Sequence, residues 1–418
     1  MLVFQKYGGT SVGSLARVRR CAERCLKVVE GGDQLVVVVS AMSGETNRLI
    51  ALANELVDPA SAEGSTGGPW IAANKRGGDH DREMDQLVAT GENVSASLLA
   101  MAVNHLGGRA VSLVGHQLGM KTDDAFTRAR ITDVETSRIR EELARGKIVV
   151  CAGFQGTSPA GDITTLGRGG SDTSAVALAA ALSADVCEIL TDVDGVFTTD
   201  PRLVSHASKI DRLCFEEMLE LASVGAKVLQ LRSVEVAARF GVPVHVRSSE
   251  HMGAGTMIVP EESSMESVVV SAVALDRNEA KITIERVADV PGSVAAIFEA
   301  LAAVGVVVDM IVQNASTEGH TDVSFTVPGQ ELQRSVELLT ARGSSVLADA
   351  DICKVSLVGL GMRSHAGVAA KMFRLLAGEG INIEMVSTST IKISVVVGER
   401  YGELALRTLH DGFGLGDP

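Results

Sequence analysis

The segment from Ile163 to Arg202 constrains the fold more than any other part of this 418-residue chain. A glycine-rich turn, Gly167 to Gly170, leads into Ser171 and Asp172, and an alanine-rich apolar run follows at once. Ser and Asp are favoured helix N-caps, so this pattern predicts a helix from about Thr173 to Ala184.

A short apolar run, Val186 to Leu190, comes next and predicts a buried strand because it hardly alternates. It ends in a polar turn, Thr191 to Gly195, at the carboxyl end of the strand, where α/β proteins bind ligands. A helix start offers N–H groups to an anion, and Arg168 adds a fork of donors for a carboxylate or phosphate. An ordinary loop with a capping Asp172 is the alternative for each feature alone. Together, and with Asp200-Pro201-Arg202 following, they favour an anion site.

The N-terminal segment predicts a strand–helix–strand unit of the same kind. The strand Leu2 to Tyr7 breaks at a glycine turn, Gly8 to Gly13. A helix from about Leu15 to Glu30 and a strand from Leu35 to Ser40 follow. A second polar turn, Ser40 to Gly44, ends that strand, and two such turns at neighbouring strand ends form one crevice.

Lys6 lies near the end of the first strand and could reach into this crevice as a point charge. A solvated strand end is the alternative, and the adjoining glycine turn favours the crevice. The turn at Gly8 and Gly9 lacks the GxxxxGK[ST] spacing, so it is not a P-loop.

Strand–helix alternation continues to about residue 246. A strand from Lys147 to Cys151, a helix from Gly225 to Phe240 and a strand from Val242 to Val246 complete the pattern. Such alternation predicts an α/β domain with a mainly parallel sheet covered by helices on both faces.

Residues 58–81 are rich in Gly, Ser and Asp, hold the only Trp, and predict a mobile loop. A helix from Arg82 leads to Gly91, and another runs from there to about Leu106. Glu92 is either a cap of this second helix or a ligand for an ammonium group.

The C-terminal part contains an internal duplication with an offset of about 75 residues. The strand at Lys281 matches the strand at Lys354, and GVVVDM at Gly305 to Met310 matches GINIEM at Gly380 to Met385. Each unit reads strand, turn, helix, strand, strand, helix. The first unit continues to a fourth strand near Ser345 to Ala348, and the second has none.

A further strand, Val268 to Ala274, precedes the first unit. We expect it to cross over and complete the second unit, which makes the first unit an insertion within the second. The predicted boundaries are 1–247 for the large domain, 248–266 for a linker, 279–349 for the inserted unit, and 267–278 plus 350–418 for the other unit.

Composition limits the function classes. The net charge of -14 argues against a nucleic-acid or anionic-membrane partner, so an anionic substrate needs a local cationic pocket. The six cysteines are scattered and form no metal-ligand set, which predicts reduced thiols in a cytoplasmic protein. No signal pattern appears, and no apolar run reaches the roughly 18 residues of a membrane span.

The ordered motifs resemble those of the aspartokinases, within the amino-acid kinase family, over essentially the whole chain. Any one motif is weak, whereas the ordered set is highly specific. The two duplicated units resemble ACT domains, and the chain looks most like the short, monofunctional form. The resemblance implies the amino-acid kinase fold followed by two ferredoxin-like βαββαβ domains. The matching motifs are Lys6-Tyr7-Gly8-Gly9-Thr10-Ser11, Ser40 in VVVSAMSG, Gly91-Glu92, Thr164 to Asp172, Thr191 to Arg202, and Gly225-Ala226-Lys227.

The resemblance implies transfer of the γ-phosphoryl group of ATP, with Mg²⁺, to the β-carboxylate of L-aspartate. The product is 4-phospho-L-aspartate, the first intermediate on the way to lysine, threonine and methionine. No protein side chain is assigned as a metal ligand, and Phe197 stands where relatives often have Tyr. The implied catalytic residues are Lys6, Arg168 and Asp172; the aspartate site is Ser40, Glu92, Arg168 and Asp172; and the nucleotide site is Lys6, Gly8, Gly9, Ser11, Thr191, Asp192, Phe197, Arg202 and Lys227.

The paired ACT-like units imply feedback inhibition by an amino acid and a homo-oligomer formed through these units. Dimerisation alone is the alternative role of the duplication. The segment Ser387-Thr388-Ser389-Thr390 has a Thr where relatives commonly have a Glu that could pair with the side-chain ammonium of lysine. Threonine is therefore favoured over lysine as the effector. The implied effector residues are Asp289, Gly292, Ser293, Val294, Gln313, Asn314, Asn382 and Ile383.

Two other functions remain as alternatives. A kinase for glutamate or N-acetylglutamate is disfavoured by Arg168 in its GRGGSD motif and by the two ACT-like units. An amino-acid sensor on an inactive kinase scaffold is disfavoured by the intact Lys6, Arg168 and Asp172. A separate regulatory chain starting at Met252 or Met257 is also left open.

Overall fold

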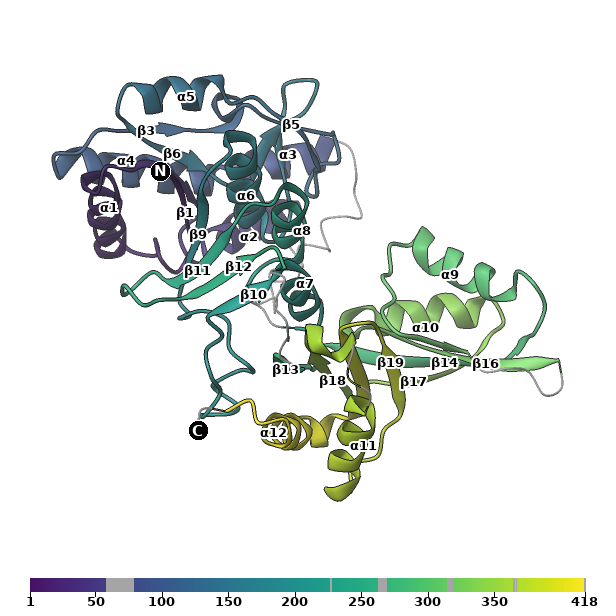
Figure 1. The fold of residues 1–418 in the computed structure, drawn as a ribbon. Coiled ribbons are helices and arrows are strands. Elements are labelled where there is room, and N and C mark those ends of the chain that lie inside the picture. Colours follow the sequence, from purple (N-terminus) through teal and green to yellow (C-terminus); the bar gives the residue numbers. More distant parts are fainter. Residues whose placement is uncertain are drawn as a thin grey trace. The chain divides into compact units, whose positions relative to one another are not determined.

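The computed structural model describes residues 1–57, 79–225, 228–261, 269–313, 319–363, 365 and 367–416. The chain divides into two compact units, and each is treated by itself below (Figure 1). The first comprises Met1–Val196, Lys209–Ala222 and Lys227–Ser263, and the second comprises Phe197–Ser208, Ser223–Ala226 and Ser264–Pro418.

The first unit is built on an eight-stranded sheet whose centre is parallel, as predicted. Only its far edge departs from this direction among the described strands, because β12 runs antiparallel to β11. In sheet order the strands are β10 (Arg212–Cys214), β12 (Thr256–Val259), β11 (Val244–Ser248), β9 (Val186–Thr191), β1 (Leu2–Tyr7), β2 (Gln34–Val39), β6 (Ile148–Ala152) and β3 (Ala110–Leu113).

Helices cover both faces of this sheet. Val3 and Tyr7 of β1 pack into one core with residues of α1 and α4, whereas α6 contacts β1, β2 and β9 and packs against α8. Successive residues of a strand point to opposite faces, so Phe4 and Lys6 face away from α1. The helices are α1 (Leu15–Glu30), α2 (Glu45–Val57), α3 (Asp79–Val88), α4 (Thr90–His105), α5 (Ser137–Ala144), α6 (Gly170–Leu182), α7 (Phe215–Ser223) and α8 (Leu231–Phe240).

A small second sheet of short strands completes the first unit. Its order is β5-β4-β7-β8, with β4 parallel to β7 and the other pairs antiparallel. The strands are β4 (Met120–Thr122), β5 (Ile131–Val134), β7 (Gln155–Thr157) and β8 (Ile163–Thr165).

Three predicted helix starts were wrong. Helix α6 begins at Gly170, because left-handed Gly169 (φ 68°) is its N-cap, so Ser171 and Asp172 lie inside the first turn. Helix α8 begins at Leu231 rather than Gly225, since Gln230 at its N-cap is still extended. Helix α3 begins at Asp79 rather than Arg82, so residues 79–81 belong to the helix and not to the predicted loop. Asp79 and Asp81 suit this position, because acidic side chains stabilise a helix N-terminus. The rest of that loop, 58–78, lies outside the described residues.

The second unit contains two four-stranded antiparallel sheets, in agreement with the expected pair of ACT-like folds. The strand ahead of the first repeat, β13, pairs with β18 of the second repeat, which is the crossover described above. The fourth strand of the first repeat is present as β17. The sheets are β15 (Ile311–Gln313), β16 (His320–Pro328), β14 (Glu279–Ala288) and β17 (Ser345–Asp349), and β13 (Ala272–Asp276), β18 (Ile352–Val358), β20 (Lys392–Gly398) and β19 (Met385–Thr388).

Ion pairs link the two repeats in both directions, and each repeat contributes a lysine. Lys354 of the second repeat pairs with Glu279 (2.6 Å) and Asp309 of the first. Lys281 of the first repeat pairs in turn with Glu384 of the second (2.6 Å). The helices are α9 (Ser293–Ala303), α10 (Leu332–Ala341), α11 (Val368–Gly378) and α12 (Gly402–Gly412).

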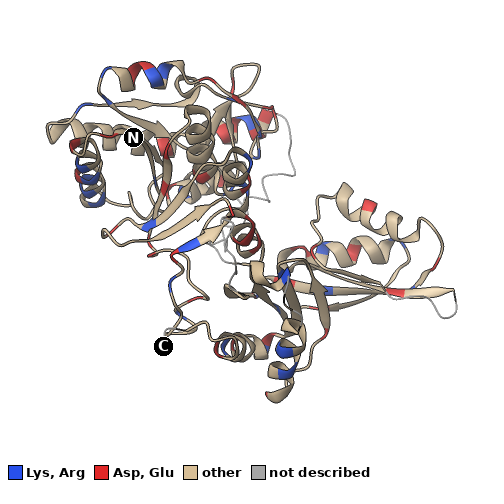
Figure 2. Cartoon of the chain, viewed as in Figure 1, with Lys and Arg blue, Asp and Glu red and all other residues tan. Residues whose placement is uncertain are grey.

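Charge and hydropathy are distributed as in a globular α/β protein. Several basic residues follow one another along α1 (Figure 2), but Arg24 is buried and donates to the carbonyl of Ser248 (2.8 Å). All six cysteines are free and buried. Among the described residues, no helix has both the length and the apolar composition to cross a bilayer.

Candidate active site

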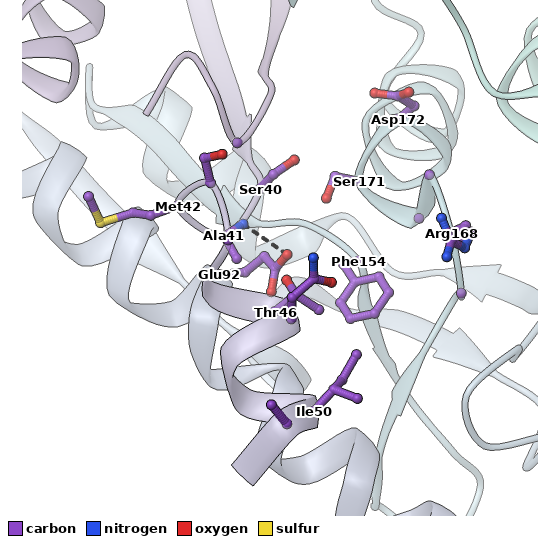
Figure 3. A pocket seen from close by; sticks show the side chains of 18 of the residues that line it. Ser40, Ala41, Met42, Thr46, Ile50, Glu92, Phe154, Arg168, Ser171 and Asp172 are labelled. Carbon is purple, nitrogen blue, oxygen red and sulfur yellow. Dashed lines mark hydrogen bonds between the residues drawn. The ribbon is translucent and has the colours of Figure 1, made fainter. Parts of the chain in front are cut away.

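A pocket of about 560 Å³ opens at the carboxyl ends of β1 and β2, beside the start of α6 (Figure 3). It brings together five residues that the sequence motifs had singled out from distant segments. Lys6, Ser40, Glu92, Arg168 and Asp172 all line it. The other lining residues are Gly9, Ala41 to Gly44, Thr46, Asn47, Ile50, Ala51, Asn54, Glu55, Phe154, Gly167 and Gly169 to Ser171.

One wall of this pocket was missed from the sequence. It consists of α2 residues such as Asn47 and Ile50, together with Phe154. The available signal was the apolar spacing between Glu45 and Val57, directly after the Ser40 to Gly44 turn, which indicates a helix.

Lys6 and Asp172 form an ion pair inside the pocket. The Nζ of Lys6 lies 2.5 Å from Oδ1 of Asp172, and each side chain is only 11% exposed. The pairing follows from the fold, since Lys6 points to the face that α6 covers and Asp172 lies in the first turn of α6. Because the two side chains are largely buried, their charges are weakly screened by water. Because both line the pocket, they can still contact a bound ligand.

Glu92 is a buried carboxylate with one oxygen in use. It is 3% exposed, and its Oε1 accepts from the backbone N–H of Ala41 at 2.9 Å (Figure 3). Its Oε2 makes no hydrogen bond to any described residue. Burial raises the pKa of Glu92 to about 7, against the opposing effects of the Ala41 bond and the charge of Lys6. The N-cap of α4 is Ala89, so the capping interpretation of Glu92 was wrong.

Glycines shape two walls of the pocket. A Cβ on Gly91 would lie 2.8 Å from the Cβ of Ala41, so only glycine lets α4 approach the Ser40 turn this closely. Gly169 has a left-handed backbone, and a Cβ there would lie 1.7 Å from Cγ of Gln230. These two positions bring Glu92 and the start of α6 to the same cavity.

Arg168 is exposed at the pocket rim and makes no ion pair with a described residue. The strand before it is fixed by Asp85, whose carboxylate accepts from the N–H of Thr165 (2.8 Å), its hydroxyl (2.6 Å) and the N–H of Thr127 (2.8 Å). Burial raises the pKa of Asp85 to about 6 despite these bonds. These bonds hold the end of β8 three residues before Arg168, which lines the pocket, and its guanidinium can bind an anion there.

The residues expected at the nucleotide lie on the neighbouring part of the same sheet edge. Ser11 donates to Ser249 (2.9 Å), and the carbonyl of Thr191 accepts from the N–H of Ser249 (2.7 Å). Thr191 also donates through its hydroxyl to Asp192 (3.1 Å). The N–H of Gly8 donates to the carbonyl of Leu190 (3.3 Å). Of this group, Lys6 and Gly9 line the pocket.

Of the other residues expected at the nucleotide, two belong to the second unit and one lies outside the described residues. Phe197 packs against the core of the second unit. Arg202, in the same unit, pairs with Asp200 at 2.7 Å. Lys227 lies outside the described residues.

The expected effector residues lie at three places in the two repeats: the turn before α9, the end of β15, and the segment before β19. Gly292 and Gly367 are the left-handed N-caps of α9 and α11, with φ of 99° and 98°. Asn314 lies outside the described residues. Asp289, Ser293 and Val294 flank Gly292, Gln313 ends β15, and Asn382 and Ile383 lead into β19.

Comparisons with known proteins identify the family. Residues 1–248 match the amino acid kinase family, and residues 283–342 and 355–413 match an ACT domain. The chain is 50% identical to an aspartokinase from Pseudomonas aeruginosa, over 100% of this chain and 98% of that protein.

Solved structures agree with this match. Aspartokinase III from Escherichia coli in complex with aspartate and ADP (R-state) is 29% identical with a TM-score of 0.79, covering 99% of both chains. The same enzyme in complex with lysine and aspartate (T-state) gives a TM-score of 0.74 at 28% identity, again over 99% of both chains. The chain therefore belongs to the amino acid kinase family, as an aspartokinase with C-terminal ACT domains.

Proposed function

We propose that this chain is an aspartate kinase, which transfers the γ-phosphoryl group of ATP to the β-carboxylate of L-aspartate. The product, 4-phospho-L-aspartate, begins the route to lysine, threonine and methionine. One observation carries the assignment beyond family membership. Lys6, Glu92, Arg168 and Asp172 converge on one pocket, and their charges match an amino acid that must meet an anionic phosphate.

The attacking carboxylate is already an anion, so the reaction needs no strong base. The difficulty is to bring this anion against the phosphates and to stabilise the charge on the transferring group. We assign that task to the ammonium group of Lys6, assisted by the N–H of Gly9. The N–H of Gly8 is not assigned to the phosphates, because it donates to the carbonyl of Leu190.

Glu92 and Asp172 are assigned to the ammonium group of aspartate. The free Oε2 of Glu92 is a buried acceptor, and an ammonium donor would remove the cost of leaving it unpaired. Arg168 is assigned to a carboxylate of the substrate, which its planar fork matches, and Ser40 supplies a hydroxyl at the same rim. Together these groups recognise both charges of an α-amino acid.

ATP is assigned to the sheet edge next to this pocket. Ser11, Thr191 and Asp192 lie there, and we add Phe197, Arg202 and Lys227 from the resemblance. Phe197 offers packing without the hydroxyl of the Tyr found in relatives.

Mg²⁺ is proposed to accompany the ATP phosphates. The lining fits an ion held mainly by phosphate and water, which is the arrangement that Mg²⁺ usually keeps, because the pocket carboxylates Asp172 and Glu92 are already assigned to the substrate ammonium. When bound, the ion neutralises phosphate charge. No side chain is assigned as a dedicated ligand.

Regulation by an amino-acid effector is assigned to the repeats, with threonine as the first choice and lysine as the alternative. A solved relative contains lysine in its T-state, which supports control of this kind. The effector site would be formed by Asp289, Gly292, Ser293, Val294, Gln313, Asn314, Asn382 and Ile383. The first repeat exposes Val290, Val307, Ile311 and Leu347, each by more than half, and such apolar area supports association of chains through the ACT domains.

The remaining parts of the proposal concern organisation. We propose a catalytic domain at 1–247, a linker at 248–266, an inserted ACT domain at 279–349, and a second ACT domain made of 267–278 and 350–418. A cytoplasmic location is proposed because all six cysteines are free.

An ADP-release assay with L-aspartate, L-glutamate and N-acetyl-L-glutamate tests the substrate. We expect turnover with aspartate and little with glutamate or N-acetylglutamate. In N-acetylglutamate, the acetyl group replaces the ammonium group that Glu92 is proposed to bind. Equal or better turnover with N-acetylglutamate would contradict the assignment. Titration of threonine and lysine into the same assay tests the effector, and inhibition by lysine alone would contradict the preference for threonine.

A further inference from the structure

A cluster of two histidines and an aspartate lies in the second unit, and none of the three residues lines the catalytic pocket. His206 comes from the segment Phe197–Ser208, and His410 and Asp411 come from α12. One ligand atom from each of the three residues lies within 4.8 Å of the other two. The proposed catalytic and effector sites use none of these side chains.

The segment from Phe197 to Ser208 is packed against α12 at this point. Val204 and Ala207 share a core with Leu406 and Leu409. Arg407 donates to the carbonyl of Leu203 (3.1 Å). The backbone around the cluster is therefore held in place by contacts that do not depend on the three polar side chains.

The spacing of the polar atoms suits a tetrahedral metal ion. Nε2 of His206 lies 2.7 Å from Oδ1 of Asp411, and Nδ1 of His410 lies 3.5 Å from the same oxygen. Ligands at the bond lengths that Zn²⁺ makes to imidazole and carboxylate lie about 3.3 Å apart in a tetrahedron. These two separations bracket that value, and the third, between the two histidine nitrogens, is no more than 4.8 Å, so rotation of the exposed His206 and Asp411 side chains would be needed to enclose an ion.

His410 carries the second observation. It is fully buried (0% exposed), yet its Nδ1 makes no hydrogen bond to any described residue. Its other nitrogen, Nε2, lies 3.0 Å from the hydroxyl of Thr198, which also accepts from the N–H of Ser208. When Nε2–H donates to Thr198, the lone pair of Nδ1 faces Asp411. Metal-binding histidines are oriented in this way, by a second partner on the far nitrogen.

We propose that His206, His410 and Asp411 form a binding site for Zn²⁺ or a closely similar transition-metal ion. Two imidazoles and one carboxylate favour such ions over Mg²⁺, which prefers oxygen ligands only. His206 and Asp411 are 51% and 59% exposed, so the ion has a path from solvent and a fourth position remains for water. A bound ion would fasten the Phe197–Ser208 segment to α12.

The test is zinc binding by the full-length chain after removal of metals with a chelator. Zn²⁺ is added in competition with a chromophoric indicator, and Co²⁺ is added separately as a spectroscopic probe. We expect one Zn²⁺ per chain and a Co²⁺ spectrum of the intense, four- or five-coordinate type. Failure of the wild-type chain to compete for Zn²⁺, or a weak six-coordinate Co²⁺ spectrum, would overturn the proposal.

The variant His206→Gln is the main probe, because this half-exposed side chain can be changed without opening the core. We expect its Zn²⁺ affinity to fall by at least about a hundredfold, beyond the 10–100-fold typical for loss of a partner behind a ligand. His105→Gln, on the exposed end of α4, is the matched control and should retain wild-type affinity. Equal affinity of His206→Gln and wild type would place the zinc elsewhere and overturn the site.

Asp411→Asn provides an independent check that does not touch a buried ring. It keeps the side-chain volume but weakens a carboxylate ligand, so it should also lose zinc affinity. Zinc should raise the melting temperature of wild type and leave those of His206→Gln and Asp411→Asn unchanged. A zinc-induced shift of the same size in all three proteins would refute the assignment.

Discussion

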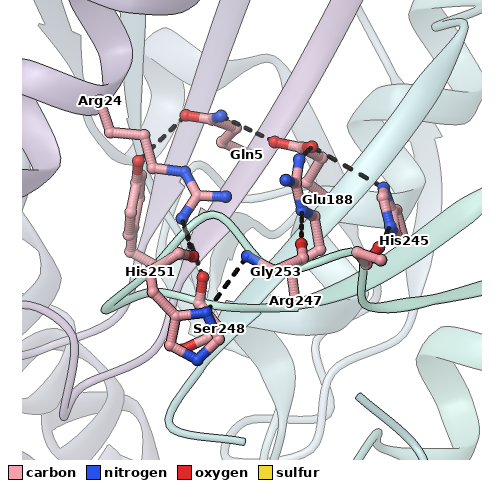
Figure 4. A network of polar contacts seen from close by, with 10 residues as sticks. Gln5, Arg24, Glu188, His245, Arg247, Ser248, His251 and Gly253 are labelled. Carbon is pink, nitrogen blue, oxygen red and sulfur yellow. Dashed lines mark hydrogen bonds and ion pairs between the residues drawn. The ribbon is translucent and has the colours of Figure 1, made fainter. Parts of the chain in front are cut away.

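The two faces of β1 carry buried polar groups that are satisfied to different degrees. On the face toward α1, Gln5 donates to Glu188 (2.8 Å) and Arg247 pairs with the other oxygen of Glu188 (2.7 Å) (Figure 4). On the opposite face, Lys6 pairs with Asp172 of α6. These two residues line the pocket at the carboxyl edge of the sheet, where Glu92 at the start of α4 keeps one buried oxygen without a hydrogen bond to any described residue. On the first face, both oxygens of Glu188 are bonded to protein groups. The charged groups at the pocket include an oxygen that only a ligand could pair with.

This contrast separates charged groups that stabilise the fold from charged groups that face the pocket. Both oxygens of Glu188 have protein donors, so removal of one partner should cost stability. The groups around Lys6 face a cavity, so their removal should cost turnover or substrate binding. Four predictions test the contrast, in order of decreasing effect.

Lys6→Ala should lower kcat by about 100-fold or more, since it removes a cation from the transferring group. Steady-state kinetics with a coupled ADP assay measures this, and a cooperative thermal transition shows that the fold persists. Gln5→Ala is the matched control, because it changes the adjacent residue on the other face and should keep kcat. Retention of more than about a tenth of wild-type kcat by Lys6→Ala, a barrier change below about 1.4 kcal/mol, would remove Lys6 from its role.

Glu188→Ala should lower the free energy of unfolding by about 3 kcal/mol, because it leaves the largely buried side chain of Arg247, 16% exposed, without its carboxylate partner. Denaturant unfolding measures the loss, and kcat per folded molecule should stay near wild type. Glu250→Ala is the control: its ion pair with Arg17 has side chains 40% and 55% exposed. That variant should change stability by less than about 1 kcal/mol. Similar losses in both variants would mean that burial of the network does not matter.

Glu92→Gln should raise the KM for aspartate by about 10- to 100-fold and leave the KM for ATP nearly unchanged, because a hydrogen bond to a charged group is worth about 1.5–3 kcal/mol. The amide keeps the volume and can still accept from Ala41. Kinetics at saturating ATP separates the two constants. A variant with wild-type KM for aspartate and reduced kcat would instead place Glu92 in the chemical step.

The pH dependence of aspartate binding should follow Glu92. Burial raises the pKa of this carboxyl to about 7 in the free protein, and only the ionised form attracts an ammonium group. The KM for aspartate should therefore be lowest above pH 7 and rise as the pH falls, by up to about tenfold per unit. Glu92→Gln should flatten the profile. An equally steep rise in that variant would assign the effect to another group.

Much of the fold follows from local patterns. The strands β1 and β9 are short apolar runs that end at polar or glycine turns, and α1 has a clear helical pattern, so the sequence predicts all three closely. The short strands β4, β5, β7 and β8 have only three or four residues each, which is too few for a periodic signal. The starts of α6 and α8 depend on the backbone conformations of Gly169 and Gln230, which packing decides.

The candidate site divides in the same way. Motifs identify Lys6, Arg168 and Asp172 as charged groups near glycine turns, because each turn follows or precedes a regular element. The motifs do not reveal that the backbone N–H of Ala41 donates to Glu92, since the two residues are 51 positions apart in the sequence. Nor do they predict the α2 wall, which only the tertiary fold brings to the pocket.

Proton release on aspartate binding tests the central claim most directly. Calorimetric titration of aspartate, with a non-hydrolysable ATP analogue present, is run at pH 7 in buffers of different ionisation enthalpy. A carboxyl with a pKa of about 7 is half protonated there and must ionise to hold the ammonium, so wild type should release about half a proton and Glu92→Gln almost none. Equal proton release by the two proteins would contradict the claim that the unpaired oxygen of Glu92 awaits the substrate.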